Sequence, residues 1–364
     1  MKNERWYQIA LTLIPGLGPT LRNRLVRHFG SAAAIFNVGI KELCAVEGIH
    51  EKGAALILSW NDHKRIEKEL QFIGQQNITP VFITDDDYPK RLLNCADPPT
   101  LLYWKGNANL NVPKVVSIIG TRICSSYGKQ VTEKIIAAMP ADMLIVSGLA
   151  WGIDAIAHKT ALEKGLQTVG ILGHGMDIIY PSKHQSLANS MQKNGGILTE
   201  FKQETPVHKH NFPKRNRIVA GMADATIVIE TAVKGGSMIT ADLAFHYNRE
   251  LFAVPGRIND AKSAGCLQLI QENKAIVFND TDHFLETMGW DKPNHTAPVQ
   301  GILIETLSQE EQRILQQIKN EEAPAIESLK QSTGLNSSRL AAALLNLELQ
   351  GFIQVLPGNR IERL

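Results

Sequence analysis

Two hydrophobic patterns divide most of the chain. Up to about residue 75, short helical patterns alternate with Pro-Gly turns, as in "LIPGLGPTLRNRLVRHFGS". From about residue 80, β-branched runs such as "PKVVSIIG" and "ATIVIE" alternate with helical segments such as "DAIAHKTALEKG". This alternation predicts an α/β fold with a doubly wound, Rossmann-like, mostly parallel sheet and helices on both faces.

The C-terminal region has a third pattern. Residues 291–305 are interrupted by proline and glycine and are expected to form a linker. Three helical patterns follow, the first capped by Ser308, and then a two-strand pattern with its turn at Pro357-Gly358-Asn359. Three helices and a hairpin predict a winged helix. The expected domains are a helical domain at 1–75, the Rossmann-like domain at 80–290 and the winged helix at 306–364.

Composition excludes several classes of protein. The formal net charge is only +2, so attraction to nucleic acid must rest on local clusters of charge. The four cysteines lie far apart without a CxxC pair, which disfavours a zinc site or a disulfide framework and suits a reducing compartment. No window approaches 18 uninterrupted apolar residues, so we expect a cytoplasmic protein with no signal peptide or membrane span.

Standard catalytic and nucleotide signatures are missing. No strand is followed by GxGxxG, and Gly128-Lys129 has neither the spacing nor the Ser/Thr of a P-loop. Ser147 lacks the GxSxG elbow, and no HExxH or Cys/His cluster points to a metal. We therefore predict no catalytic residue, no metal and no cofactor.

Loops that follow the predicted strands carry glycines, hydroxyls and an arginine: "GTRICSSYG", "SGLAWGID", "GHGMDIIYP" and "GGSMITAD". Carboxyl ends of parallel strands meet at one sheet edge, and backbone N–H groups, hydroxyls and guanidinium suit phosphate oxygens. These loops predict a site for a phosphate-bearing ligand. Its candidate residues here are Gly120, Thr121, Arg122, Ser125, Gly148, Ser237 and Thr240.

A cationic stretch is expected at the same edge. Residues 202–217 hold five basic side chains against Glu204, together with Phe212. Cations that neutralise phosphates and an aromatic ring that stacks on a base favour single-stranded nucleic acid. The alternative is that Arg215 or Arg217 pairs with Glu200 or Glu230 and only holds the end of the sheet, which we expect for at least one of them.

The N-terminal turn is a second candidate for phosphate contact, and its residues have two equally good explanations. Gly16 and Gly18 precede a helix with Arg22 and Arg24, an arrangement that resembles a helix-hairpin-helix motif, and "LCAVEGIHEKGAALILSW" is a looser copy. Gly16, Gly18, Arg22 and Arg24 are possible secondary phosphate contacts. A plain helical hairpin with its arginines in solvent explains the same residues equally well.

The motifs "GTRICSSYG", "SGLAWGIDAIAHKTAL", "GHGMDIIYP", "FPKRNRIVAG" and "GSMITADLAF" followed by "FAVPG" occur in this order over about residues 80 to 275. In this the chain resembles the DprA/Smf family of DNA-processing proteins of natural transformation. Two loops depart from the family pattern: His184 replaces a usual Asn, and "GCLQLIQENKAIV" lacks the usual Asn and Gly-Ala pair.

The resemblance implies a homodimer that binds single-stranded DNA without sequence preference, protects incoming DNA and helps to load the RecA recombinase. It also implies helical, sterile-alpha-motif-like and winged-helix flanks. Carried over to this sequence, the nucleic-acid pocket involves Gly120, Thr121, Arg122, Phe212, Lys214, Arg215, Asn216 and Arg217.

Two further expectations concern the alternative function and the winged helix. LOG-like nucleoside-monophosphate hydrolases share the superfamily, but Leu243 stands where their catalytic Glu is expected, with Asp242 one position early. Residues 300–364 carry six basic and eight acidic residues, a net charge of −2. We therefore expect the winged helix to contact protein or to regulate rather than to bind duplex DNA.

Overall fold

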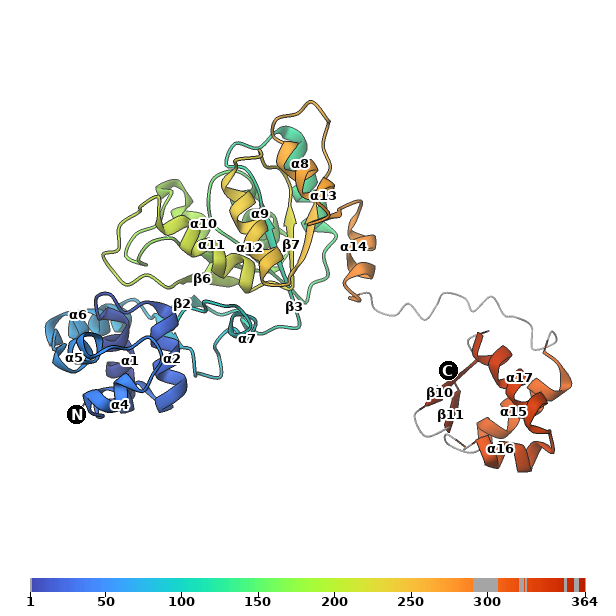
Figure 1. Cartoon of the computed structure of the whole chain (residues 1–364). Coiled ribbons are helices and arrows are strands. Elements are labelled where there is room, and N and C mark those ends of the chain that lie inside the picture. The colour runs from blue at the N-terminus through green and yellow to red at the C-terminus, as the bar shows by residue number, and fades with distance from the viewer. Residues whose placement is uncertain are drawn as a thin grey trace. The chain divides into compact units, whose positions relative to one another are not determined.

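The computed structural model describes residues 2–290, 307–320, 324, 326–349, 352–356 and 360–363. It divides into two compact units, Met1–Trp290 and Asp291–Leu364, which are described separately (Figure 1). The expected linker at 291–305 and the turn at 357–359 lie outside the described residues. Among the described helices, none combines the length and apolar character needed to cross a membrane.

The first unit begins with a bundle of short helices, as predicted. They are α1 (Glu4–Leu13), α2 (Pro19–Phe29), α3 (Ala32–Phe36), α4 (Ile40–Cys44), α5 (Glu51–Ser59) and α6 (His63–Gln75). Gly16 lies in the turn before α2 with φ +75°, a conformation that favours glycine, and Pro19 takes the first helical position. The bundle core includes Ile78, Phe82 and Leu101 of the next segment, so the helices pack directly on the first strands of the sheet.

One nine-stranded sheet forms the centre of this unit. Its strands are β1 (Thr79–Phe82), β2 (Leu101–Gly106), β3 (Lys114–Ile119), β4 (Met143–Ser147), β5 (Gln167–Ile171), β6 (Gly195–Thr199), β7 (Ala225–Val228), β8 (Glu250–Ala253) and β9 (Ile276–Val277). The order is β1-β2-β6-β5-β4-β3-β7-β8-β9. From β6 to β9 all neighbours are parallel, which confirms the predicted sheet, whereas β1 and β2 add an antiparallel edge that the sequence pattern did not reveal.

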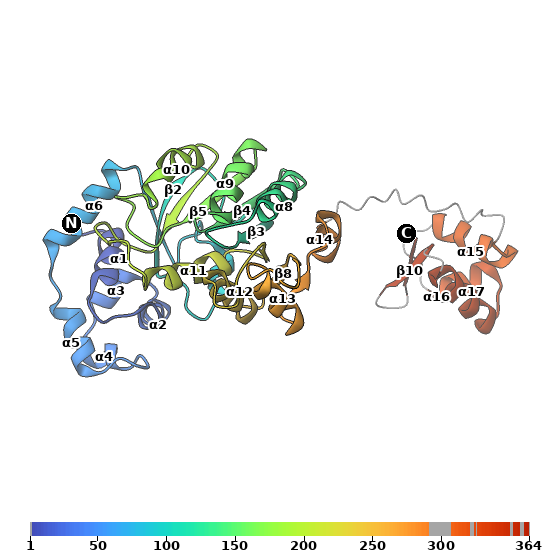
Figure 2. The same cartoon turned by 90° about the horizontal axis from the view of Figure 1, so that it is seen from above.

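Helices cover both faces of the sheet, as Figure 2 shows. One face carries α8 (Ser126–Ala137), α9 (Ile153–Glu163), η1 (Ser182–His184), α10 (Gln185–Met191) and α14 (Thr281–Thr287), and the other carries α7 (Lys90–Leu93), α11 (Asn211–Gly221), α12 (Gly236–His246) and α13 (Ala264–Gln271). Alternate residues of β3 enter the two cores, Val115 and Ile119 on one side and Val116 and Ile118 on the other.

The strand order places a switch point in the middle of the sheet. From β3 the chain runs outward through β4, β5 and β6, and it then returns to the other side of β3 to form β7 and β8. The loops after β3 and β7 therefore leave the sheet in opposite directions. A crevice at such a point, beyond the carboxyl ends of the strands, is the usual ligand position in doubly wound folds.

The second unit has the predicted winged-helix elements: α15 (Gln309–Asn320), α16 (Ile326–Thr333), α17 (Ser337–Leu349), β10 (Ile353–Leu356) and β11 (Arg360–Arg363). Ser308 caps α15 as expected, because its hydroxyl accepts from the Glu311 N–H while the Glu311 carboxylate accepts from the Ser308 N–H. On α17, Arg339 donates to Glu310 of α15 at 3.2 Å. Arg339 is the one arginine of α17, and α17 is the helix that would enter a DNA groove. Its guanidinium is paired with Glu310.

An aromatic cluster attaches α14 to the sheet and gives a test of the fold. Phe284 is 1% exposed, and its ring lies 4.9 Å from that of Phe252 and 5.7 Å from that of Trp290. We expect Phe284→Ala to lower the free energy of unfolding of the first unit by about 3–5 kcal/mol, because it leaves a cavity in this cluster. Denaturant titration followed by circular dichroism measures the change.

The matched control is Phe245→Ala, since Phe245 lies on α12 in the same unit and is 43% exposed. It should change the free energy of unfolding by no more than about 0.5 kcal/mol. Equal destabilisation by the two substitutions would contradict this packing.

Candidate functional site

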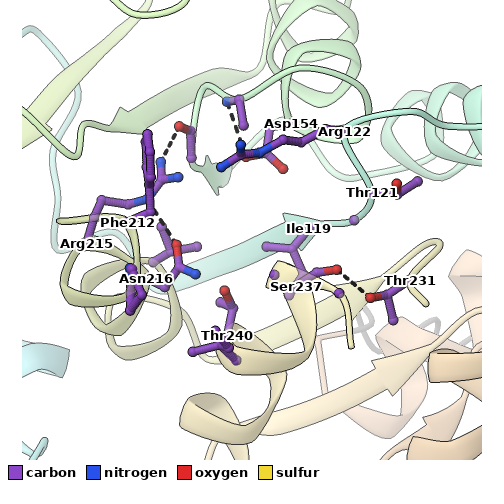
Figure 3. A pocket seen from close by; sticks show the side chains of 18 of the residues that line it. Ile119, Thr121, Arg122, Asp154, Phe212, Arg215, Asn216, Thr231, Ser237 and Thr240 are labelled. Carbon is purple, nitrogen blue, oxygen red and sulfur yellow. Dashed lines mark hydrogen bonds between the residues drawn. The ribbon is translucent and has the colours of Figure 1, made fainter. Parts of the chain in front are cut away.

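A pocket of about 560 Å³ opens at the switch point of the sheet. Its walls come from the loops after β3, β4 and β7 and from the first turns of α11 and α12 (Figure 3). Segments that are far apart in the sequence thus converge at one sheet edge, as the strand-end rule predicted. Of the sequence-predicted site residues, the pocket is lined by Gly120, Thr121, Arg122, Gly148, Phe212, Arg215, Asn216, Ser237 and Thr240.

One wall combines exposed cations with an aromatic ring. Arg122 is exposed, and its guanidinium carbon lies 5.0 Å from the centre of the Phe212 ring. Lys209 is exposed at the same wall. Within the described part of the chain, neither Arg122 nor Lys209 has a carboxylate within ion-pair distance. Both charges are therefore available to an anionic ligand.

The opposite wall is the N-terminus of α12. Gly235 is its N-cap without a side-chain cap, and the N–H groups of Gly236 and Ser237 meet no acceptor among the described residues. Thr240, one turn further on, is only 3% exposed and lines the pocket, yet its hydroxyl has no partner in the described chain. The Ser237 hydroxyl donates to Thr231 at 2.7 Å. Free N–H groups, an unpaired hydroxyl and the helix dipole together suit a phosphate group.

Arg215 forms the base of the pocket rather than a free cation. Its side chain is 4% exposed, and Nη1 donates to the carbonyls of Gly148 and Ile171, which end β4 and β5. Burial lowers the pKa of Arg215 to about 10, although Asp154 opposes that shift. The residue stays charged at neutral pH and ties α11 to the sheet.

Asp154 lies beside this arginine and is 7% exposed. Gly152 is the N-cap of α9, and the Asp154 carboxylate accepts from the Ala150 N–H at 3.3 Å. Burial raises the pKa of Asp154, and the Arg215 charge opposes this rise. The negative charge of Asp154 partly offsets the positive charge of the buried guanidinium.

The other predicted residues lie outside the pocket. Arg217 pairs with Glu200 and donates to the carbonyl of Asp97, so the expectation that Arg215 or Arg217 holds the sheet end is confirmed. The N–H and the hydroxyl of Ser125 donate to the buried carboxylate of Glu230. Lys214 is exposed on α11 and does not line the pocket.

The N-terminal candidates are also engaged elsewhere. Arg22 donates to the Thr12 carbonyl at 2.8 Å and borders a separate pocket of about 170 Å³. Arg24 lies 3.5 Å from the Glu47 carboxylate. Gly16 and Gly18 flank the turn before α2 but do not line the pocket at the sheet edge.

Sequence reasoning missed several pocket residues. Lys209 was counted only as part of the basic stretch, and Gly235, Gly236 and Thr231 were passed over although they belong to the loop "ETAVKGGSMIT". A Gly-Gly pair before a helix was the available signal. Trp151 and Tyr180 line a small apolar extension beside Phe212, but nothing in the sequence places them there.

The described lining of the pocket contains no carboxylate from α12. Asp242, the nearest match to a hydrolase carboxylate, lies 3.3 Å from Lys274 and does not line the pocket. In the part of the chain that the structure describes, no cluster of His, Cys, Asp and Glu could hold a metal ion. The chemistry of the pocket is that of binding an anion and a flat apolar ring.

His158 lies beneath the pocket and gives a pH test. It is fully buried; its Nδ1 donates to Thr168 at 2.7 Å because the Thr168 hydroxyl is committed to the Ile145 carbonyl, and Nε2 has no partner in the described chain. Burial lowers the pKa of His158 from 6.5 to about 3, helped by the nearby His184 and Arg215.

Below pH 6.5 His158 is protonated in the unfolded chain but stays neutral in the folded chain. The free energy of unfolding therefore falls as pH drops from 6.5 towards 3. Between pH 7 and pH 5 the wild type should lose about 2 kcal/mol of unfolding free energy more than His158→Asn, which keeps an N–H donor but cannot titrate. Denaturant titration at both pH values checks this. His174, whose pKa burial also lowers, is present in both proteins and cancels; identical pH slopes would contradict the assignment.

Models of known protein families match the three regions of the chain that were described above. A model described as DNA recombination-mediator protein A matches residues 79–289. Models of a SAM-like helix-hairpin-helix tandem and of a DprA winged helix domain match residues 9–59 and 303–359. Protein Smf of Synechocystis is 30% identical over 399 aligned residues, which cover 99% of both chains. The DNA processing protein DprA of Streptococcus pneumoniae is 39% identical over 204 residues, or 56% of this chain and 72% of the relative.

Two solved structures are similar to this chain in both fold and sequence. The X-ray structure of DNA processing protein A from Streptococcus pneumoniae superposes with a TM-score of 0.70 at 31% identity and covers 79% of this chain and 98% of its own. DNA processing protein A from Helicobacter pylori gives a TM-score of 0.52 at 32% identity, over 58% of this chain and 95% of its own. That structure is described in terms of a single-stranded DNA binding mode.

Proposed function

Because the chain belongs to the DNA recombination-mediator protein A (DprA/Smf) family, we propose that it binds single-stranded DNA, without sequence preference, in the pocket at the sheet edge. One observation carries the proposal: the Arg122 guanidinium lies 5.0 Å from the Phe212 ring, opposite the free N-terminus of α12. The single-stranded DNA binding mode of the Helicobacter pylori relative supports the same ligand.

The phosphate and the base of a nucleotide bind at different places in the pocket. A phosphate is held between Arg122 and Lys209 on one side and the N–H groups of Gly236 and Ser237 on the other. An adjacent base stacks on Phe212, which requires an unpaired base because a base in a duplex has both faces covered. These donors contact phosphate rather than base edges, so the binding reads no sequence.

The proposal is a binding function rather than catalysis. Asp154 is the carboxylate in the pocket wall, and it accepts from the Ala150 N–H and balances Arg215. It is held by these groups instead of facing a nucleophile. The pocket wall also offers no carboxylate from α12, where a nucleoside-monophosphate hydrolase would need one.

The family resemblance alone supports the wider role. We propose that the protein is a cytoplasmic homodimer that protects incoming single strands in natural transformation and recombination and helps to load the RecA recombinase onto them. The division into domains at 1–75, 80–290 and 306–364, which rests on the hydrophobic patterns along the chain, stays a prediction.

Salt dependence tests the phosphate contacts. Each phosphate contact to a single strand contributes about −0.7 to the slope of log affinity against log salt concentration. Arg122→Ala and Lys209→Ala should each lower the affinity for an oligodeoxythymidine and flatten this slope by about that amount. Fluorescence anisotropy at several salt concentrations measures both quantities.

Two variants make the test specific. Lys193→Ala removes an exposed lysine at the amino end of β6, away from the pocket, and should leave affinity and slope unchanged. Phe212→Leu should weaken binding by about 1–3 kcal/mol, roughly 5- to 150-fold, while the slope stays the same. Wild-type slope and affinity in Arg122→Ala would exclude this pocket as the binding site.

Dimerisation is tested on the whole protein. Static light scattering should give the mass of two chains of 40.2 kDa each. The measurement is made at tens of micromolar, roughly the upper range of ordinary dissociation constants. A mass of one chain at that concentration would argue against the homodimer and leave the DNA pocket unaffected.

A further inference from the structure

Large apolar side chains are exposed on the loops that follow β3, β7 and β8 and on the first turn of α8. Ile258 is 89% exposed and Ile123 is 77% exposed, and in the described chain no other large hydrophobic side chain is as exposed as these two. Val233 is 49% exposed and Tyr127 is 47% exposed. Single exposed apolar residues are ordinary, but several on adjoining loops beside a pocket indicate a contact surface.

Two of these residues continue the pocket wall, and a hydrogen bond links the elements that carry the other two. Ile123 directly follows Arg122 and itself lines the pocket, and Val233 lies between the pocket residues Ala232 and Gly235. Ile258 belongs to the loop after β8, which lies against the first turn of α8 because the Tyr127 hydroxyl donates to the Pro255 carbonyl at 3.1 Å, and α8 directly follows the loop that carries Ile123. We call these four residues, Ile123, Tyr127, Val233 and Ile258, the rim strip.

Cations accompany the rim strip. The same three loops and the start of α8 carry five basic residues and three acids, a net charge of +2: Arg122, Lys129, Lys234, Arg257 and Lys262 against Glu133, Glu230 and Asp260. Burial raises the pKa of the Cys124 thiol, and Lys262 and Lys129 oppose this rise, so both lie near the loop after β3. The strip therefore pairs apolar side chains with an excess of positive charge.

This combination matches one class of partner. A single nucleic-acid strand presents flat apolar base faces next to anionic phosphates, and an apolar strip flanked by cations meets both. The rim strip begins at Ile123, which lines the pocket next to Arg122. A protein partner would account for the apolar residues but not for their continuity with the phosphate site.

We propose that the rim strip is a second segment of the single-stranded DNA surface and takes the nucleotides next to the one held in the pocket. The inference rests on the proposed function and extends it, because it sets the direction of the strand: from the pocket, over the loop after β3, to the loop after β8. It also makes affinity grow with oligomer length.

The test compares a short and a longer oligodeoxythymidine, about 4 and about 12 nucleotides, within the range of known single-strand site sizes. The variant is Val233→Ser with Ile258→Ser, since neither residue lines the pocket and both are exposed; Ile123 stays because it does line it. The variant should bind the short oligomer as the wild type does and bind the longer one about fivefold to tenfold more weakly. Leu56→Ser with Leu93→Ser, two leucines that are 41% and 48% exposed elsewhere in the same unit, is the control and should change neither affinity.

A second variant tests the charges. Lys234→Ala with Arg257→Ala should flatten the salt slope for the longer oligomer only, by about 0.7 for each phosphate that the variant no longer neutralises. Full affinity of the Val233/Ile258 variant for the longer oligomer would overturn the inference while leaving the pocket in place. If that variant instead changes the oligomeric state, the strip is a protein interface and the inference is wrong. Wild-type protein that binds neither oligomer overturns the proposed function and this inference with it.

Discussion

The guanidinium of Arg215 holds the carboxyl ends of two parallel strands together. By donating to the carbonyls of Gly148 and Ile171, it fixes α11 across the ends of β4 and β5. The position of Phe212, three residues earlier on the same helix, depends on this contact. A buried cation of this kind is tolerated because Asp154 balances it, so removing either partner would leave an uncompensated charge in the interior.

This constraint separates the cations in α11 and just before it into two groups. Arg215 and Arg217 are buried and bind carbonyls and carboxylates of the sheet, whereas Lys209, just before the helix, faces the pocket. The buried pair sets the geometry, and Arg122 and Lys209 supply the charge that a ligand can reach. Phosphate recognition is completed by α12, whose N-terminus brings N–H groups and the free Thr240 hydroxyl to the opposite wall.

The hydrophobic pattern predicted the central parallel strands, and the rule for strand ends predicted which sheet edge carries the pocket. Apolar β-branched runs that end in Gly predicted β3 to β8, and the rule for strand ends then gathered Arg122, Ser237 and Thr240 at one edge. The direction of each side chain on α11 could not be predicted, because "KRNR" places three cations within four residues and the helical phase alone does not say which face is buried. The antiparallel β1 and β2 were also missed, since short strands at a sheet edge carry little periodic signal.

Photocrosslinking tests the central claim most directly. An oligodeoxythymidine that carries a photoreactive base is bound to the whole protein and irradiated, and the crosslinked peptides are identified by mass spectrometry. A base that stacks on Phe212 should crosslink to the peptide of residues 209–217 or to the neighbouring rings Tyr180 and Trp151. Crosslinks confined to the N-terminal helices α1–α6 or to residues 307–363 would contradict the account.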